Sequence, residues 1–234
     1  ISFTTIEIVN ERLTDSSDLK AILQIISMSS EFTSIKVRDE EIGELNDMKH
    51  NCCIVGGDLK LDDENTKTII LLQGYIAQWQ PDQPTLFSDF NYISQNAGRI
   101  TRALFEICVQ RGWASTAYLV LCLCKSVERR LWFTEHPLLQ VPIHRELLAR
   151  IVKRNLSLDD LRDMDNDEIN AYLDQKNIGG SVHKYVRMIP YYLVEGMLQP
   201  VTSTIIRVSV SITCDYDWSL KIHGPVAFGR RTEN

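Results

Sequence analysis

The chain has 234 residues, of which 44% are hydrophobic and 24% are charged, and its formal net charge is −6. This composition is typical of a globular protein with a proper core, and the negative charge argues against a general binder of polyanions. The sequence holds no run of about 18 apolar residues, so no segment is predicted to span a membrane.

The first residues, ISFTTIEIVNERL, show neither an initiator Met nor the basic and then apolar layout of a secretory signal. We therefore expect a piece of a longer chain. We also expect the six cysteines to be free thiols in a reducing compartment.

The charge is unevenly distributed along the chain. The net charge is −9 over residues 1–90, +6 over residues 91–154 and −3 over residues 155–234. A basic segment within an acidic chain can mark a surface that faces nucleic acid, but charges on solvated faces also cluster by chance. Composition alone leaves both interpretations open.

The first 80 residues are predicted to be mainly helical. An amphipathic run at 19–28 follows residues that favour a helix N-cap. A short extended piece at 35–37 precedes an acid-rich helix start, and residues 50–66 are expected to form a loop. The apolar run at 68–79 fits a buried helix or strand, and its helical neighbours favour the helix.

The middle of the chain is predicted to hold two long helices. PDQP at 81–84 breaks the preceding element, and a helix then begins at Ser88 or Asp89 and ends at Gly112. Residues 113–131 have apolar side chains at helical spacing. The two prolines of HPLLQVP predict a linker after them.

Beyond this linker the predicted helices are short. The segment RELLARIVKRN predicts one helix. Two capping arrangements, Ser157 with Asp160 and Asp165 with Glu168, predict the starts of two more helices. NIGGSVHKYVRMIP places a glycine pair before a further helix. From residue 204, apolar and polar residues alternate in TIIRVSVSITCDYDW, which predicts a strand with one solvent-exposed face.

The helix that ends at Gly112 divides into an apolar arc and a narrow polar stripe when residues are spaced by about 100°. The arc holds Ile93, Ala97, Ile100, Leu104, Ile107 and Cys108, extended by Phe105 and Val109. The stripe holds Gln95, Asn96, Arg99, Arg102, Glu106 and Gln110. A surface helix normally has a wider polar face. We therefore expect this helix inside a bundle, with its stripe lining a groove or channel.

Asn96 and Arg99 are three residues apart, so both can contact the same ligand. A guanidinium group suits a phosphate or a base face, and an amide suits a base edge, which makes single-stranded nucleic acid a candidate ligand. The alternative is structural. Arg99 and Arg102 could form ion pairs with acids elsewhere in the bundle, or Arg102 could pair with Glu106 on the next turn.

Other candidate chemistry is weak. No phosphate loop and no nucleophile arrangement is present, so no catalytic residue is predicted and the segment is not expected to hydrolyse ATP. His50 with Cys52 and Cys53 lacks a second pair of ligands, so no metal site is predicted. The helix start at NIGG could hold a phosphate with Lys184 nearby, or be an ordinary helix start.

Several segments occur in a specific order: SSEFTSIKVRDEEIGEL, ILLQGYI, QNAGRITRALFEICVQRGW, LCKSVERRLW and HPLLQ, then NIGGSVHKYVRMIP and DYDWSLKIHG. Together they resemble the Sec-sixty-three homology domain of Ski-two-like RNA helicases over nearly the whole chain. The resemblance implies a mainly α fold. It would comprise a helical bundle at 1–140 with a ratchet helix at about 89–111, a helix-loop-helix domain at 141–190, and the first strands of an incomplete immunoglobulin-like β-sandwich at 191–234.

Within this family the chain is more similar to the N-terminal cassette of the helicase subunit of the activating signal cointegrator complex (yeast Slh-type) than to the spliceosomal Brr-type helicase. The resemblance implies that Asn96 and Arg99 grip single-stranded RNA or DNA between ATP-driven steps. Arg102 and Gln95 join them because they lie on the same stripe, and Lys184 is a further candidate nucleic-acid-binding residue.

The resemblance also implies the setting of the segment. RecA-like motor and winged-helix domains of the parent chain would adjoin it, and they would bind ATP and Mg, whereas the segment itself would hold no cofactor. Subunits of a larger complex would be partners, in the nucleus and cytoplasm. The competing function is a protein-docking scaffold without nucleic-acid binding, as in an inactive helicase cassette or a translocon subunit.

Overall fold

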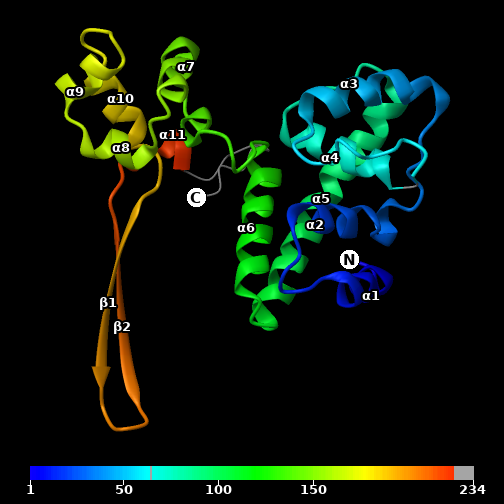
Figure 1. Cartoon of the computed structure of the whole chain (residues 1–234), viewed down its shortest axis with the longest axis horizontal. Coiled ribbons are helices and arrows are strands. Elements are labelled where there is room, and N and C mark those ends of the chain that lie inside the picture. Colours follow the sequence, from blue (N-terminus) through cyan, green and yellow to red (C-terminus); the bar gives the residue numbers. More distant parts are fainter. Residues whose placement is uncertain (64, 224–234) are drawn as a thin grey trace. The chain divides into compact units, whose positions relative to one another are not determined.

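The computed structural model describes residues 1–63 and 65–223, and the chain divides into two compact units, Ile1–Glu135 and the part from His136 onward (Figure 1). The described residues are mostly helical and include one two-stranded antiparallel sheet. This confirms the predicted class, which was mainly α with the first strands of a β part.

The first unit is helical throughout its regular elements. They are α1 (Phe3–Arg12), α2 (Leu19–Ser27), η1 (Ser30–Phe32), η2 (Asp39–Glu41), α3 (Ile42–Cys52), α4 (Thr66–Ile76), α5 (Pro84–Gln110) and α6 (Ala114–Arg129), where η marks a 3₁₀ helix.

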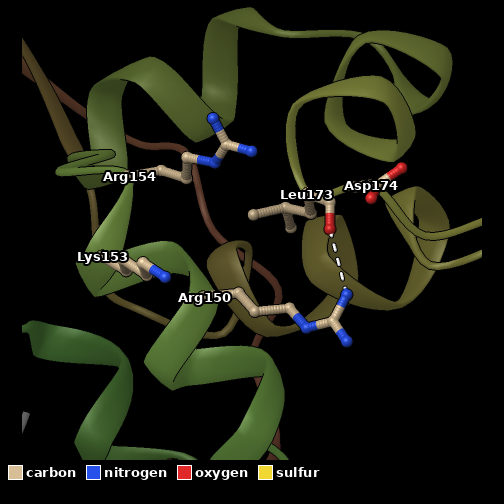
Figure 2. Close-up of a pocket in the computed structure, with 5 residues that line it drawn as sticks. All are labelled: Arg150, Lys153, Arg154, Leu173 and Asp174. Atoms are coloured by element: carbon tan, nitrogen blue, oxygen red, sulfur yellow. Dashed lines mark hydrogen bonds between the residues drawn. The ribbon is translucent and has the colours of Figure 1, made fainter.

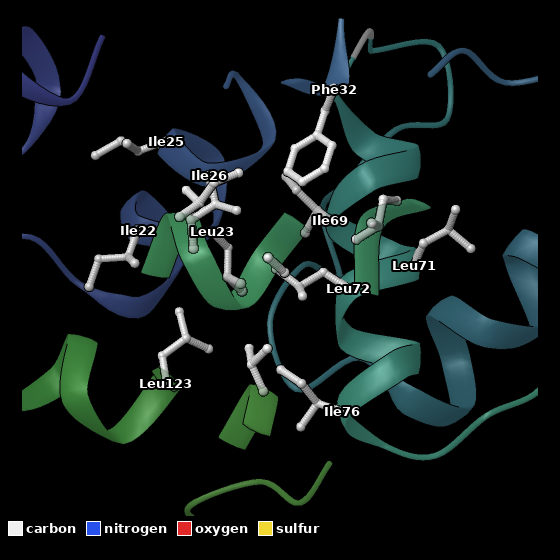
Figure 3. Packing of buried hydrophobic residues seen from close by; sticks show 14 of the residues in the cluster. Ile22, Leu23, Ile25, Ile26, Phe32, Ile69, Leu71, Leu72, Ile76 and Leu123 are labelled. Atoms are coloured by element: carbon white, nitrogen blue, oxygen red, sulfur yellow. The ribbon is translucent and has the colours of Figure 1, made fainter. Parts of the chain in front are cut away.

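Helix α4 lies in the middle of the first unit's core. All of residues 66–74 are buried, and the helix packs against α2, α3, α5 and α6. Figure 3 shows side chains from several of these helices converging, among them Leu23 of α2, Leu72 of α4 and Leu123 of α6. A helix that is apolar on nearly all sides must be buried, which explains why α4 lies in the core.

Helix α5 is longer than the sequence predicted. It begins at Pro84 rather than at Ser88 or Asp89, because proline at the first helical position needs no hydrogen-bond partner for its nitrogen. PDQP therefore ends one element and also starts the next. The C-terminal end agrees with the prediction. Gly112 has a φ of +71°, and the N–H of Trp113 donates to the carbonyl of Cys108 over 3.0 Å, as in a Schellman motif.

The second unit contains short helices around a core of its own. The elements described are η3 (Pro137–Gln140), α7 (Arg145–Lys153), α8 (Leu158–Asp163), α9 (Asn166–Tyr172), α10 (Gly179–Val186), β1 (Tyr192–Pro200), β2 (Ile206–Cys214) and α11 (Leu220–His223). The two predicted capping arrangements open α8 and α9.

The segment HPLLQVP is not the free linker that its prolines suggested. Its residues 137–140 form a 3₁₀ helix, and both Leu138 and Val141 are buried in the second core. Leu138 joins Ile151 of α7 and Leu161 of α8 in the same cluster. The prediction was wrong because proline limits helix propagation but does not prevent a short apolar turn from packing.

Strands β1 and β2 form an antiparallel hairpin in which Tyr192 lies opposite Cys214 and Pro200 opposite Ile206. The strand predicted from residue 204 is confirmed as β2. Side chains alternate between the two faces of a strand, so every second residue shares a face. One face is apolar throughout and carries Tyr192, Val194, Leu198, Ile206, Val208, Val210 and Ile212, all of them exposed.

Candidate nucleic-acid interface

The polar stripe of α5 lies on the surface of the first unit. Gln95, Arg99, Arg102, Glu106 and Gln110 are exposed, whereas the opposite arc of Ile93, Ala97, Ile100, Leu104 and Cys108 is buried. The buried arc is narrower than predicted, because Val109, which was expected to extend it, is 55% exposed. The division of the helix into two faces otherwise follows the predicted helical spacing.

Asn96 and Arg99 form a hydrogen-bonded pair on this stripe. Nη2 of Arg99 donates to Oδ1 of Asn96 over 2.6 Å, and Nδ2 of Asn96 donates to the carbonyl of Tyr92 over 2.8 Å. Asn96 is only 8% exposed, and both the oxygen and the nitrogen of its amide are already hydrogen-bonded within the helix. Arg99 is exposed, and a guanidinium group has five N–H donors, so most of its donors remain open to a ligand.

Arg99 and Arg102 differ in their ionic partners. Within residues 1–63 and 65–223, no carboxylate lies within ion-pair distance of Arg99. Arg102 instead donates from Nε to Oε1 of Glu128 on α6 over 2.6 Å. The structural alternative drawn from the sequence therefore holds for Arg102, with an acid elsewhere in the bundle and not with Glu106. The carboxylate of Glu128 would therefore compete with a phosphate for the guanidinium group of Arg102.

Four charged side chains fix the start of α5 to the rest of the unit, and we refer to Arg38, Glu41, Lys67 and Asp89 as the Lys67 cluster. Nζ of Lys67 lies 2.5 Å from Oε2 of Glu41, 2.7 Å from Oδ2 of Asp89 and 3.0 Å from the carbonyl of Lys36. These contacts use all three N–H donors of the ammonium group. Nη1 of Arg38 donates to Oε1 of Glu41 over 2.6 Å.

The Lys67 cluster keeps a carboxylate ionised inside the protein. Glu41 and Lys67 are both fully buried. Burial by itself raises the pKa of Glu41, but hydrogen bonds from Lys67, Thr85 and Arg38 outweigh it, so this pKa lies below its ordinary value of 4.5. Because Asp89 precedes Asn96 by two turns of α5, the cluster positions the helix that carries the candidate site.

The structure does not bring Lys184 to a helix N-terminus. Helix α10 begins at Gly179, but Lys184 is exposed and lies in its last turn. The backbone N–H groups of Ile178 and Gly179 already donate to Oδ1 of Asn170, over 2.9 and 2.8 Å. The helix start at NIGG is thus capped by a side chain of α9, and the ordinary helix start is the better interpretation.

The second unit carries a basic groove that the sequence analysis missed. Its cavity of about 550 Å³ is lined by Arg150, Lys153, Arg154, Leu173 and Asp174 (Figure 2). Nη1 of Arg150 donates to the carbonyl of Leu173 over 3.2 Å. The three cations lie at the C-terminal end of α7, where positive charge interacts favourably with the helix dipole. Stabilisation of the helix therefore accounts for them even if no ligand binds. The signal in the sequence was the positive net charge of residues 91–154.

No group of three or more His, Cys, Asp or Glu in the described part of the chain is arranged to hold a metal ion. The six cysteines are free thiols. None of the described helices is both long and apolar enough to cross a bilayer.

The sequence of the chain matches a known protein family. Residues 1–228 match the Sec63 Brl domain. Activating signal cointegrator 1 complex subunit 3 of Bos taurus is 40% identical over 229 residues, which cover 97% of this chain and 10% of that protein. The RQC trigger complex helicase SLH1 of Saccharomyces cerevisiae is 34% identical over 226 residues, covering 96% of this chain and 11% of that protein.

A spliceosomal relative is also similar. The U5 small nuclear ribonucleoprotein 200 kDa helicase of Homo sapiens is 33% identical over 225 residues, covering 96% of this chain and 10% of that protein. The chain spans about a tenth of the length of the curated relatives it matches. The higher identity with the bovine cointegrator subunit agrees with the order of resemblance expected from the motifs. Matches over nearly the whole chain confirm the predicted resemblance, and the chain belongs to the Sec63 Brl domain family.

Proposed function

We propose that this chain is the non-catalytic nucleic-acid-channel module of an ATP-dependent helicase, and that α5 is a ratchet helix that grips the tracking single strand of RNA or DNA. Two relatives are helicases by name, which supports a helicase-associated role. The observation that carries the proposal is Arg99, an exposed guanidinium held by Asn96, with no carboxylate partner in the described part of the chain.

The geometry of this pair suits a phosphate group. A guanidinium can bind phosphate through two parallel N–H donors, and one further donor of Arg99 is already used by Asn96. Asn96 therefore acts as a positioning residue that limits the rotamers of Arg99. Gln95 is exposed on the same stripe and can donate to a second acceptor on the strand.

In this proposal the chain would bind the nucleic-acid strand but would not hydrolyse ATP. ATP and Mg would be bound by RecA-like motor domains elsewhere in the parent chain, which would adjoin this module together with a winged-helix domain. The names of the relatives place them in complexes, namely the activating signal cointegrator 1 complex, the RQC trigger complex and a small nuclear ribonucleoprotein. We therefore propose subunits of a larger complex as further partners, and action in the nucleus and cytoplasm.

Arg99→Leu in the full-length protein tests the proposal. Leucine is a good helix former and position 99 is exposed, so the melting temperature should hardly change. ATP hydrolysis should survive, because its residues would lie in other domains. Unwinding should fall, since one charge-assisted hydrogen bond contributes about 1.5–3 kcal/mol to holding the strand. Melting temperature, RNA-stimulated ATPase and duplex unwinding are the measurements.

Lys60→Leu is the matched control, because Lys60 is an exposed cation in the loop between α3 and α4. It removes the same charge and should leave unwinding unchanged. Normal unwinding by a stably folded Arg99→Leu protein would contradict the ratchet assignment and favour the docking scaffold. A parallel fall of melting temperature, ATPase and unwinding would instead assign Arg99 a structural role.

A further inference from the structure

Tyr92 is an aromatic side chain that lies in line with the polar stripe of α5. It is 45% exposed. At about 100° per residue, it lies about 40° around the helix from Asn96 and about 20° from Arg99. At about 1.5 Å per residue, it precedes them along the helix axis by about 6 Å and about 10 Å. The stripe therefore continues toward the start of α5 with an aromatic ring.

The ring of Tyr92 is supported from the core. It meets the ring of Phe32 edge to face, with centroids 6.4 Å apart and planes at 82°, and Phe32 is only 2% exposed. Such a contact stabilises one orientation of the ring. In the described part of the chain the Tyr92 hydroxyl has no hydrogen-bond partner, so a buried polar contact does not explain the residue.

The backbone of Tyr92 is linked to the candidate site as well. Its carbonyl accepts the Asn96 amide, and the Asn96 amide in turn accepts Arg99. An oriented ring, an amide and a guanidinium thus follow one another along a single helix face. Proteins that hold single-stranded nucleic acid combine cations for the backbone with aromatic rings on which bases stack. A single exposed aromatic residue is ordinary on a protein surface, and its alignment with Asn96 and Arg99 is what distinguishes this one.

We propose that Tyr92 is a stacking platform for one base of the strand whose phosphate Arg99 binds. This rests on the proposed function and adds a contact to the base. The base must be unpaired and unstacked on one side, because neighbouring bases cover both of its faces in a duplex. The contact is tolerant of sequence, since every base has an aromatic face.

The test measures binding of the full-length protein to two labelled probes, a single-stranded oligoadenylate and an abasic oligomer of equal length and charge. Tyr92→Leu should weaken binding of the oligoadenylate about 5- to 150-fold, the equivalent of about 1–3 kcal/mol for one stacked base. Tyr92→Phe should bind like the wild type, because the ring suffices. Tyr118→Leu is the matched control, since Tyr118 is a 71% exposed tyrosine on α6, and it should bind normally.

The abasic probe separates stacking from a structural effect. Tyr92→Leu and wild type should bind it equally, since no base is present to stack. An equal loss on both probes, or no loss on the oligoadenylate, would overturn the proposal. Arg99→Leu should weaken both probes and reduce the slope of log K against log salt by about 0.7 per lost phosphate contact. If this loss occurs without any effect of Tyr92→Leu, the stacking proposal fails and the ratchet assignment stands; if neither variant weakens binding, both fail.

Discussion

Replacing Lys67 by methionine tests whether the Lys67 cluster stabilises the first unit. Methionine fills a similar volume without a charge. The substitution removes the ammonium group that lies 2.5 Å from Glu41 and 2.7 Å from Asp89, and it leaves Glu41 fully buried. Breaking a buried pair by removing one partner costs about 3–5 kcal/mol, because the remaining charge loses an opposite charge beside it.

Lys20 provides a matched control for this magnitude. Its Nζ also lies 2.5 Å from a carboxylate, that of Asp58, but the two side chains are 41% and 69% exposed. An exposed ion pair contributes about 0–1 kcal/mol, since water solvates the charge that remains. Lys67→Met should therefore lower the free energy of unfolding by at least about 2 kcal/mol more than Lys20→Met does.

Urea unfolding at pH 7, followed by far-ultraviolet circular dichroism, measures both variants. The slope of the free energy against urea should stay constant while the midpoint falls. In a heating scan, the melting temperature of the first unit should fall by about 10–15 °C in Lys67→Met. Adding Asp89→Asn should recover part of the loss, because it removes one of the two carboxylates that would then share Arg38 as their cation. Equal stability of the two lysine variants would refute the reasoning.

Three further predictions concern pH, packing and capping. The pKa of Glu41 is lowered in the folded chain, so its contribution is present above about pH 4.5 and is lost as pH falls through the folded pKa; the urea midpoint of the wild type should fall with acid more steeply than that of Glu41→Gln. Gly179→Ala should cost about 1–3 kcal/mol, because a Cβ would lie 2.4 Å from the carbonyl oxygen of Asn166, whereas Gly180→Ala meets its nearest atom at 4.0 Å and should be neutral or stabilising. Ser157→Ala removes the cap of α8 and should cost about 1 kcal/mol by the same unfolding measurement.

The candidate helix was largely predictable because its signals are local. Helical spacing separated the buried from the exposed residues of α5, and Gly112 marked its end. The start was missed because proline both breaks and begins helices. The exposure of Val109 was missed as well, because helical spacing and hydrophobicity do not define how wide the buried arc of a helix is.

The site itself was only partly predictable. Asn96 and Arg99 stood out by residue type and spacing, but spacing could not assign Glu128 as the partner of Arg102, because they lie on different helices. The Lys67 cluster left one signal in the sequence, a lysine directly before the apolar run of α4, and such a lysine can be buried only beside acidic side chains. Its partners come from η2 and α5, so folding alone brings them together.

The hairpin of β1 and β2 has a consequence for the behaviour of this polypeptide in solution. Its strands carry one acidic and one basic residue, Glu195 and Arg207, so they have no net charge to oppose association. Edge strands that lack repelling charges accept further strands, and an exposed apolar face favours stacking of the sheets that result. Turbidity should therefore rise with protein concentration and respond little to salt. A lysine in place of Val194 or Val210 would act as a gatekeeper against such assembly.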